Sequence, residues 1–222
     1  SDYARRFGFG SYTGIDLPGE IKGLVPSPEW KERVYNTKWV GGDTVNMSIG
    51  QGFLNATPIQ MANMVAMIVN EGVIYKPHLL KEIRDSVTGT VIERKTSEIL
   101  HTSSIHNSTF KTIQDYMRGV ITDGTAKVVI TTEAVKIAGK TGTGEVGLED
   151  SWNAWFIAYG PYDALPEDQI VVVTMVEAVN DWEWWAIRAA NIIFQGFFAE
   201  ETYDEAIDSL HWGWLRNKRK PE

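Results

Sequence analysis

Apolar positions recur along the chain with two periods, one typical of helices and one typical of strands. Residues Thr57-Pro58-Ile59-Gln60 form a predicted capping box with proline in the first turn, and they open a helix that extends to about Asn70. Because this segment is apolar on nearly all sides, we expect the helix to be buried. An apolar stripe over 109–122 predicts a second helix. A third helix is expected over 185–198, with these residues toward a sheet: Ala186, Ala189, Ala190, Ile193, Phe194 and Phe197.

Runs of apolar residues typical of strands lie mostly in the second half of the chain. We expect three strands, at 135–145, 153–160 and 170–177. Since the links between them are short, the three strands should be antiparallel neighbours in one sheet. Two shorter alternating segments, 79–84 and 90–93, predict a hairpin with a glycine-containing turn.

The N-terminal region carries more turn signals than apolar periodicity. Residues 1–6 are expected to end a helix, and Ser27 followed by Pro28 is expected to start another. Residues 36–42 are predicted to be loop, and Gly50 and Gly52 on either side of Gln51 indicate a tight backbone passage.

The composition excludes several classes of protein. The 222 residues are 43% hydrophobic, which is enough for one or two domains with a sizeable core. A net charge of -8 argues against a nucleic-acid-binding protein. The absence of cysteine excludes disulfides and thiol chemistry, and the four scattered histidines share no ligand spacing, so we expect no metal and no cofactor.

The candidate chemistry lies in Lys140-Thr141-Gly142-Thr143, at the point where a predicted strand changes from apolar to polar. A lysine supplies a positive charge, two hydroxyls can bind a carboxylate, and a glycine allows close approach to the backbone. Gly139-Lys140-Thr141 could also close a phosphate loop, but that motif requires a glycine where Ala134 stands. The other interpretation is the Lys-Thr-Gly triplet of penicillin-binding proteins and serine β-lactamases.

Six motifs in a fixed order favour the second interpretation. They are Phe7-Gly8-Phe9-Gly10 with Thr13-Gly14-Ile15-Asp16-Leu17; Gly42-Asp43-Thr44; Ile49-Gly50-Gln51-Gly52 with Ala56-Thr57-Pro58-Ile59-Gln60-Met61; Asp123-Gly124-Thr125-Ala126; Gly139-Lys140-Thr141-Gly142-Thr143; and Ala154-Trp155-Phe156 with Tyr159-Gly160-Pro161. Together they resemble the C-terminal part of the transpeptidase domain of class B penicillin-binding proteins, of the penicillin-binding protein 2 type.

The resemblance implies a serine-type D-Ala-D-Ala transpeptidase that cross-links peptidoglycan stem peptides through an acyl-enzyme and binds penicillin. The family's motifs run in the order Ser-x-x-Lys, Ser-x-Asn and Lys-Thr-Gly. Only the third stands in its place here. Ser108-Thr109-Phe110-Lys111 and Ser151-Trp152-Asn153 match the first two by letter but occur too late in the chain, and Ser108 is expected to cap a helix. We therefore expect no nucleophile in this chain and no activity of the isolated polypeptide.

The resemblance also assigns roles to the residues that match the third motif. Lys140 and Thr143 would be catalytic, with Lys140 providing a positive charge and the Thr143 N–H providing half of an oxyanion hole. Thr141, Gly142 and Thr143 would bind the substrate, the two hydroxyls at its carboxylate.

The implied fold is α/β (α+β), an antiparallel sheet flanked by helices, incomplete at its N-terminal side. The chain would be the C-terminal portion of one transpeptidase domain. Within it, 1–134 would be a mainly helical and loop lobe with a hairpin near 79–94, 135–199 would carry the sheet strands and the final helix, and 200–222 would be a tail. The strand at 170–177 would lack a neighbour on one side, which predicts a homodimer through this edge.

The implied partners are peptidoglycan stem peptides, β-lactam antibiotics, a membrane glycosyltransferase and proteins of the elongation complex, but no nucleic acid. The implied location is the outer face of the bacterial cytoplasmic membrane or the periplasm, with an N-terminal anchor absent from these residues. Two alternatives remain: a non-catalytic domain of the same fold that binds cell-wall peptide or a partner protein, and a D,D-carboxypeptidase or β-lactamase relative.

Overall fold

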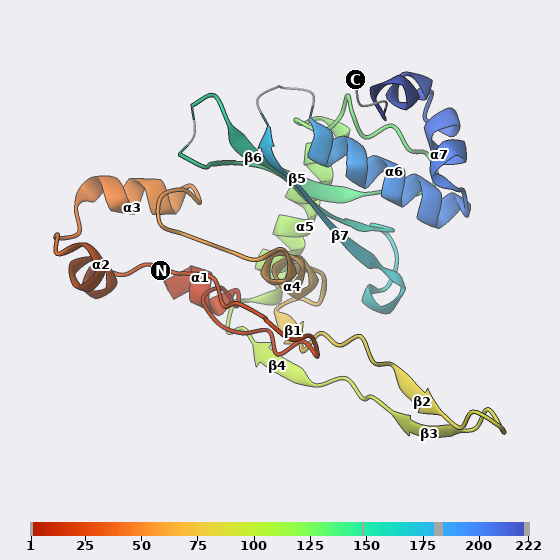
Figure 1. Ribbon diagram of the computed structural model, residues 1–222, viewed down its shortest axis with the longest axis horizontal. Coiled ribbons are helices and arrows are strands. Elements are labelled where there is room, and N and C mark those ends of the chain that lie inside the picture. Colours follow the sequence, from red (N-terminus) through yellow and green to blue (C-terminus); the bar gives the residue numbers. More distant parts are fainter. Residues whose placement is uncertain (1, 148, 180–183, 220–222) are drawn as a thin grey trace. The chain divides into compact units, whose positions relative to one another are not determined.

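The computed structural model of the chain describes residues 2–147, 149–179 and 184–219 (Figure 1). The chain forms two compact units, residues 1–110 and residues 111–222. Residues 111–134, which the sequence assigned to the helical and loop lobe, belong to the second unit. The expectations for Ser1 and for residues 220–222 fall outside the described residues. None of the helices within the described ranges has both the length and the apolar character needed to cross a bilayer.

The first unit combines helices with two separate pairs of antiparallel strands. Its elements are α1 (Asp2–Arg6), α2 (Pro28–Tyr35), α3 (Gly41–Ser48), α4 (Pro58–Val69), β1 (Val73–Tyr75), β2 (Glu82–Arg84), β3 (Val91–Arg94) and β4 (Ile99–Thr102). β2 pairs with β3, which confirms the predicted hairpin. The pairing of β1 with β4 was not predicted from the sequence.

Helix α4 begins with the predicted capping box. The Gln60 N–H donates to the Thr57 hydroxyl at 3.3 Å, and the Gln60 side-chain oxygen accepts from the Thr57 N–H at 3.0 Å. The Gln60 amide nitrogen also donates to the carbonyl oxygens of Ser11 and Lys22, so this buried side chain ties the helix to the preceding loop. Val65 and Met67 lie in the core, as the apolar sequence of this helix predicts.

The expectation of loop over 36–42 was wrong at its end, because α3 begins at Gly41, whereas the positive φ angles of Gly50 and Gly52 confirm the tight backbone passage expected around Gln51. Two glycines in its first turn weaken the sequence signal for this helix. The Asp43 carboxylate supports it by accepting from the Val40 N–H at 2.8 Å and from Lys31 Nζ at 2.6 Å. The hydrogen bond from Lys31 is the main cause that lowers the pKa of Asp43. A side chain ten residues away in sequence from the helix start therefore stabilises the helix.

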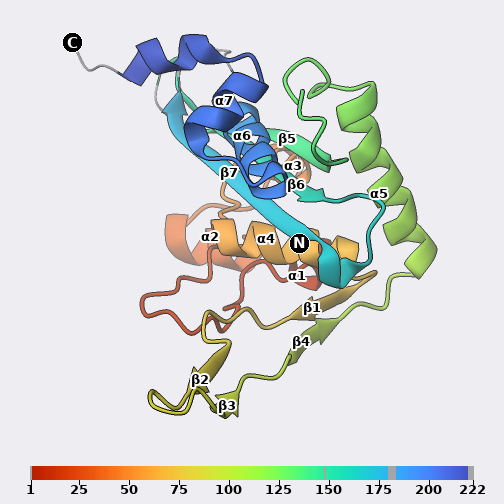
Figure 2. The same cartoon turned by 90° about the vertical axis from the view of Figure 1, so that its right-hand side faces the viewer.

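The second unit contains a three-stranded antiparallel sheet in the order β5-β6-β7, which confirms the predicted arrangement. Its elements are most of α5 (Asn107–Thr122), then β5 (Ala138–Glu145), β6 (Trp152–Gly160), η1 (Pro166–Asp168), β7 (Ile170–Val179), α6 (Trp185–Ala199), α7 (Tyr203–Ser209) and η2 (Gly213–Arg219). α6 packs against β6 and β7, and α7 lies beside α6 (Figure 2). The antiparallel sheet and its helices confirm the mixed α/β fold class.

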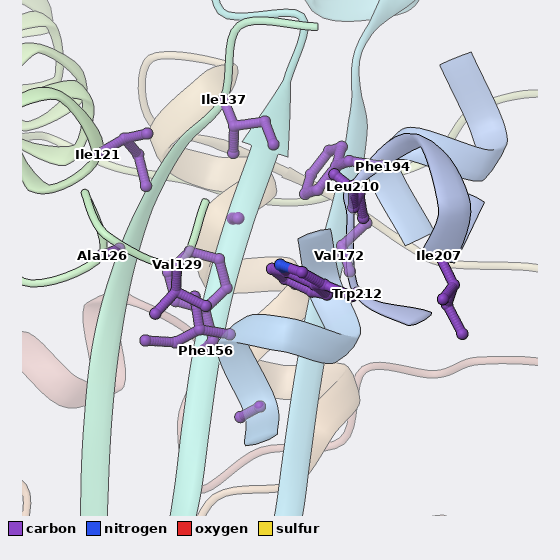
Figure 3. Packing of buried hydrophobic residues seen from close by; sticks show 14 of the residues in the cluster. Ile121, Ala126, Val129, Ile137, Phe156, Val172, Phe194, Ile207, Leu210 and Trp212 are labelled. Atoms are coloured by element: carbon purple, nitrogen blue, oxygen red, sulfur yellow. The ribbon is translucent and has the colours of Figure 1, made fainter. Parts of the chain in front are cut away.

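The core of this unit lies between the sheet and the helices that cover it. Phe156 of β6 and Val172 of β7 contribute from the sheet, and Phe194 of α6 contributes from the helix side (Figure 3). The segment expected to be a tail is part of this core, since Ile207 of α7 and Trp212 after it are buried there. Residues 200–219 are therefore an ordered part of the fold, and the expectation of a tail was wrong for them.

The buried face of α6 also differs from the predicted one. Ile193 and Phe197 were expected to face the sheet, but they are 45% and 60% exposed, whereas Asn191 and Gln195 are buried. The Asn191 side chain donates to the Val129 carbonyl oxygen and accepts from the Thr132 N–H, both at 3.2 Å. Because these amide hydrogen bonds satisfy the backbone of residues 129–132, the helix buries polar residues that an apolar pattern does not reveal.

Candidate functional site

Lys140, Thr141, Gly142 and Thr143 lie in β5, an outer strand of the sheet in the described part of the chain. The strand changes from buried to exposed at the predicted point, because Ala138 and Gly139 are buried and Lys140 is exposed. A phosphate loop would place this lysine between a strand and a helix. The lysine here stands within a strand, so the phosphate-loop interpretation was wrong.

Gly139 is required at the start of this segment for steric reasons. A Cβ atom on Gly139 would lie 2.8 Å from the Ile157 carbonyl oxygen and 2.8 Å from the Phe156 ring. Any side chain here would push β5 away from β6. Gly139 therefore keeps the polar residues that follow it in register with β6, where Lys140 stands opposite Ile157 and Thr143 opposite Ala154.

The peptide groups of Thr141 and Thr143 face the outer edge of β5. The Phe156 carbonyl oxygen, opposite Thr141, accepts from the Thr174 hydroxyl at 3.4 Å and thus faces β7. The Ile137 carbonyl oxygen, at the start of the strand, accepts from Arg118 at 2.6 Å on the side away from β6. Since peptide groups alternate in direction along a strand, both observations place the N–H and C=O groups of the two threonines outward.

The side chains of β5 alternate as well, so the two threonines share one face of the sheet and Lys140 and Gly142 share the other. Lys140 nevertheless reaches the outer edge, because its Nζ donates to the Thr141 carbonyl oxygen at 2.8 Å. The structure therefore brings a lysine cation to the same edge as the outward peptide groups. The threonine hydroxyls do not lie at that edge. They project from the adjacent face of the sheet, which α6 covers.

A cavity of about 210 Å³ opens on the threonine face. Hydroxyls from Thr125, Thr141 and Thr143 line part of it. The rest is mainly aromatic and apolar, and is lined by Trp152, Ala154, Trp155, Trp184, Trp185, Ala186 and Ile187. Lys140 is not among the residues that line this cavity. Such a mixture of hydroxyl donors and apolar walls suits a small ligand with one polar end.

Thr125 is the residue of this site to which the sequence assigned no role. It belongs to the turn after α5, and its hydroxyl oxygen lies 3.2 Å from that of Thr141. The motif Asp123-Gly124-Thr125-Ala126 was visible in the sequence. No local signal in it indicates contact with a strand that begins more than ten residues later.

The two other serine-containing segments take ordinary structural positions. Ser108 is the second residue of α5, and both its N–H and its hydroxyl lie within hydrogen-bond distance of His106 Nδ1, at 3.2 and 2.8 Å. His106 rather than Ser108 therefore caps the helix, and the expectation of a serine cap was wrong. Trp152 and Asn153 begin β6 opposite Glu145 and Gly144, as predicted for this segment.

Two tyrosines with raised pKa values lie near the start of β5. The Tyr162 hydroxyl donates to Asp115 Oδ1 at 2.7 Å, and this hydrogen bond is the main cause that raises the pKa of Tyr162 to about 12. Burial raises the pKa of Tyr159, which stands opposite Ala138. Neither tyrosine lines the cavity, and both phenols are protonated at neutral pH.

Known proteins are similar to this chain in both sequence and fold. The Peptidoglycan D,D-transpeptidase MrdA of Haemophilus influenzae is 33% identical over 196 residues, which are 80% of this chain but 29% of that protein. The chain therefore spans less than a third of the length of this curated relative.

Two solved structures that contain a chain of similar fold are structures of protein complexes. One is the complex between Penicillin-Binding Protein (PBP2) and MreC from Helicobacter pylori, with 28% identity, a TM-score of 0.65, and coverage of 79% of this chain and 31% of that one. The other belongs to a peptidoglycan synthase complex that coordinates polymerization and crosslinking, with 30% identity, a TM-score of 0.68, and coverage of 96% of this chain and 32% of that one.

The family model for the penicillin binding protein transpeptidase domain matches residues 1–198. This match confirms the resemblance inferred from the six motifs, and the relatives agree with the penicillin-binding protein 2 type. The chain, with its Lys-Thr-Gly segment on an outer strand, belongs to the family of penicillin-binding protein transpeptidase domains.

Proposed function

We propose that this chain forms one wall of the acyl-transfer site of a peptidoglycan D,D-transpeptidase, which cross-links stem peptides through a serine acyl-enzyme and binds penicillin. The observation that carries the proposal is the arrangement of β5. Its outward peptide groups, its two hydroxyls and the Lys140 amine gather at one exposed strand, beside a cavity. The names of the relatives support this activity over that of a carboxypeptidase or β-lactamase.

The hydroxyls of Thr141 and Thr143 bind the carboxylate end of the substrate. An ionised carboxylate only accepts hydrogen bonds, and hydroxyls are suitable donors. Gly142, which lies between them and is exposed, allows the substrate backbone to lie against the strand. These three residues are the substrate-binding part of the site.

The N–H of Thr143 serves as one donor of an oxyanion hole. Its direction suits this role, because the peptide group faces the outer edge of β5 and not β6. Donors of this kind each contribute ~3 kcal/mol to catalysis in other enzymes. Lys140 stabilises the negative charge of substrate and intermediate, since its Nζ reaches the same edge. Lys140 and Thr143 are therefore the catalytic residues we assign.

We assign no nucleophile in this chain, and we expect the chain alone to form no covalent penicillin adduct. Ser108 fits Ser-x-x-Lys by letter but lies at the exposed start of α5, where its hydroxyl pairs with His106. The test is incubation with a fluorescent penicillin followed by denaturing electrophoresis. A labelled band that is lost in Ser108→Ala would contradict this assignment.

Binding of the donor end of a stem peptide tests the site itself. We expect N-acetyl-D-alanyl-D-alanine to shift the amide NMR signals of β5, and Thr143→Val to weaken binding about tenfold to a hundredfold through loss of one charge-assisted hydrogen bond. Lys140→Met should weaken it as well, while Lys111→Met on the exposed surface of α5 serves as the matched control. Equal affinity in wild type, Thr143→Val and Lys140→Met would overturn the proposed function.

The partners and the location follow from the same proposal. The solved relative from Helicobacter pylori forms a complex with MreC, and another belongs to a peptidoglycan synthase complex. We infer that a protein carrying this chain works beside elongation-complex proteins and a membrane glycosyltransferase, on the outer face of the cytoplasmic membrane. A co-purification of this chain with MreC from the same organism, absent for an unrelated domain, tests the inference.

A further inference from the structure

The motif Asp123-Gly124-Thr125-Ala126 forms a turn that follows α5 without a break. The N–H of Gly124 donates to the Gly119 carbonyl oxygen at 2.9 Å, and the N–H of Ala126 donates to the Val120 carbonyl oxygen at 3.1 Å. Both bonds reach back into the last turns of the helix. They fix the backbone on each side of Thr125.

Steric constraints hold the same two neighbours of Thr125. A Cβ atom on Gly124 would lie 2.8 Å from the Val120 Cα atom, so only glycine allows the turn to fold this closely onto the helix. Ala126 is fully buried in the core of the second unit. Thr125 itself is exposed, so the motif presents one hydroxyl outward from a rigid support.

That hydroxyl meets the candidate site at Thr141. The two hydroxyl oxygens lie 3.2 Å apart, and both residues line the cavity. In such a pair only one hydroxyl donates to the other. When Thr141 donates its hydrogen to a carboxylate, Thr125 has to be the donor to Thr141, and the two bonds strengthen each other.

We propose that Thr125 is a positioning residue that turns the Thr141 hydroxyl into a donor and thereby selects ligands with a free carboxylate. The inference rests on the proposed function, since it concerns the same site. It also explains Gly124 and Ala126, because both residues hold the backbone of Thr125 in place. It also predicts a specificity that a merely structural contact would not produce.

The test compares a carboxylate ligand with its amide. N-acetyl-D-alanyl-D-alanine and its C-terminal amide are titrated into the 222-residue chain, and binding is followed by amide NMR shifts. In Thr125→Val we expect affinity for the acid to fall about fivefold, because the hydroxyl–hydroxyl bond that supports Thr141 as a donor is lost, and affinity for the amide to change less than about twofold. The amide end can donate its own N–H to Thr141 and does not need that hydroxyl's hydrogen.

Two further variants complete the experiment. Thr125→Ser retains the hydroxyl and should restore the preference for the acid, and Thr109→Val on the exposed surface of α5 controls for the loss of a surface hydroxyl. If the acid binds to wild type and weakens in Thr143→Val but not in Thr125→Val, this inference is overturned and the proposed function stands. If neither peptide binds to the wild-type chain, both are overturned.

Discussion

The guanidinium of Arg118 on α5 donates a 2.6 Å hydrogen bond to the carbonyl oxygen of Ile137, the residue that precedes β5. The same guanidinium lies over the Tyr162 ring, 6.0 Å from its centre. Ile137 is buried, and its carbonyl oxygen faces away from β6. The hydrogen bond from Arg118 therefore satisfies a backbone acceptor that has no partner within the sheet. It holds the helix that carries the Thr125 turn against the strand that carries the site.

We expect Arg118→Met to destabilise the second unit by about 1–3 kcal/mol, since it leaves a buried carbonyl oxygen without its charged donor. The measurement is urea unfolding followed by circular dichroism. Arg84→Met removes an exposed arginine paired with Glu82 and should change stability by less than about 1 kcal/mol. Equal losses in the two variants would show that the Ile137 contact has no special weight.

The pKa of Tyr162, raised to about 12 by its hydrogen bond to Asp115, gives a pH-dependent prediction. A tyrosine with a raised pKa keeps its proton longer in the folded than in the unfolded state. Its contribution to stability is therefore complete below about pH 10 and is lost as pH rises toward 12. In Asp115→Asn the pKa of Tyr162 should fall toward its ordinary value, which a ¹³C NMR titration of the tyrosine ring would show.

Asp168→Asn, in η1, is the control for removal of one carboxylate from the same unit. It should leave the titration of Tyr162 unchanged. The explanation fails if Asp115→Asn also leaves it unchanged, because burial and not the hydrogen bond would then dominate.

The buried face of α6 is tested by two phenylalanines on the same helix. Phe194 is 0% exposed and Phe197 is 60% exposed. Phe194→Ala should cost about 3–5 kcal/mol of unfolding free energy through loss of buried contacts and an unfilled cavity, while Phe197→Ala should cost less than about 1 kcal/mol. Chemical denaturation of both variants measures the difference. A larger loss of unfolding free energy for Phe197→Ala than for Phe194→Ala would instead support the buried face predicted from the apolar pattern.

The outer edge of β7 gives the prediction of self-association. Within the described residues β7 pairs with β6 alone, and its Met175 is 38% exposed. Such an apolar edge pairs readily with another strand, so we propose that the chain forms a homodimer there. Light scattering over a range of concentrations should show a dimer for wild type and a monomer for Met175→Lys, because an edge lysine opposes strand pairing.

Val128→Lys, at an exposed residue in the turn after α5, is the matched control and should leave the dimer intact. A wild-type chain that stays monomeric at every concentration would count against pairing through β7.

Elements set by neighbouring residues could be predicted from the sequence. The capping box of Thr57 and Gln60 acts within one helical turn, and α4 begins where that box predicts. The change from apolar to polar residues at Gly139 correctly indicated where β5 becomes exposed. The β5, β6 and β7 order followed from the short links between apolar runs.

Features that depend on distant partners could not be predicted. Helix α3 is supported by Lys31, which contacts Asp43 from another helix. The rotation of α6 depends on Asn191 binding a backbone segment about sixty residues earlier in the chain. In the candidate site, the motif predicted the four residues of β5, but the contact of Thr125 with Thr141 arises only when the turn and the strand come together.

The alternation along β5 makes the segment sensitive to its length. Each residue there differs from the next in the direction of its peptide group and of its side chain. A single inserted residue between Gly139 and Lys140 would move the threonine side chains to the face of the sheet that Lys140 and Gly142 now share, and would turn the threonine N–H groups toward β6. Evolution and protein engineering can therefore exchange side chains in this strand far more easily than they can add or delete one.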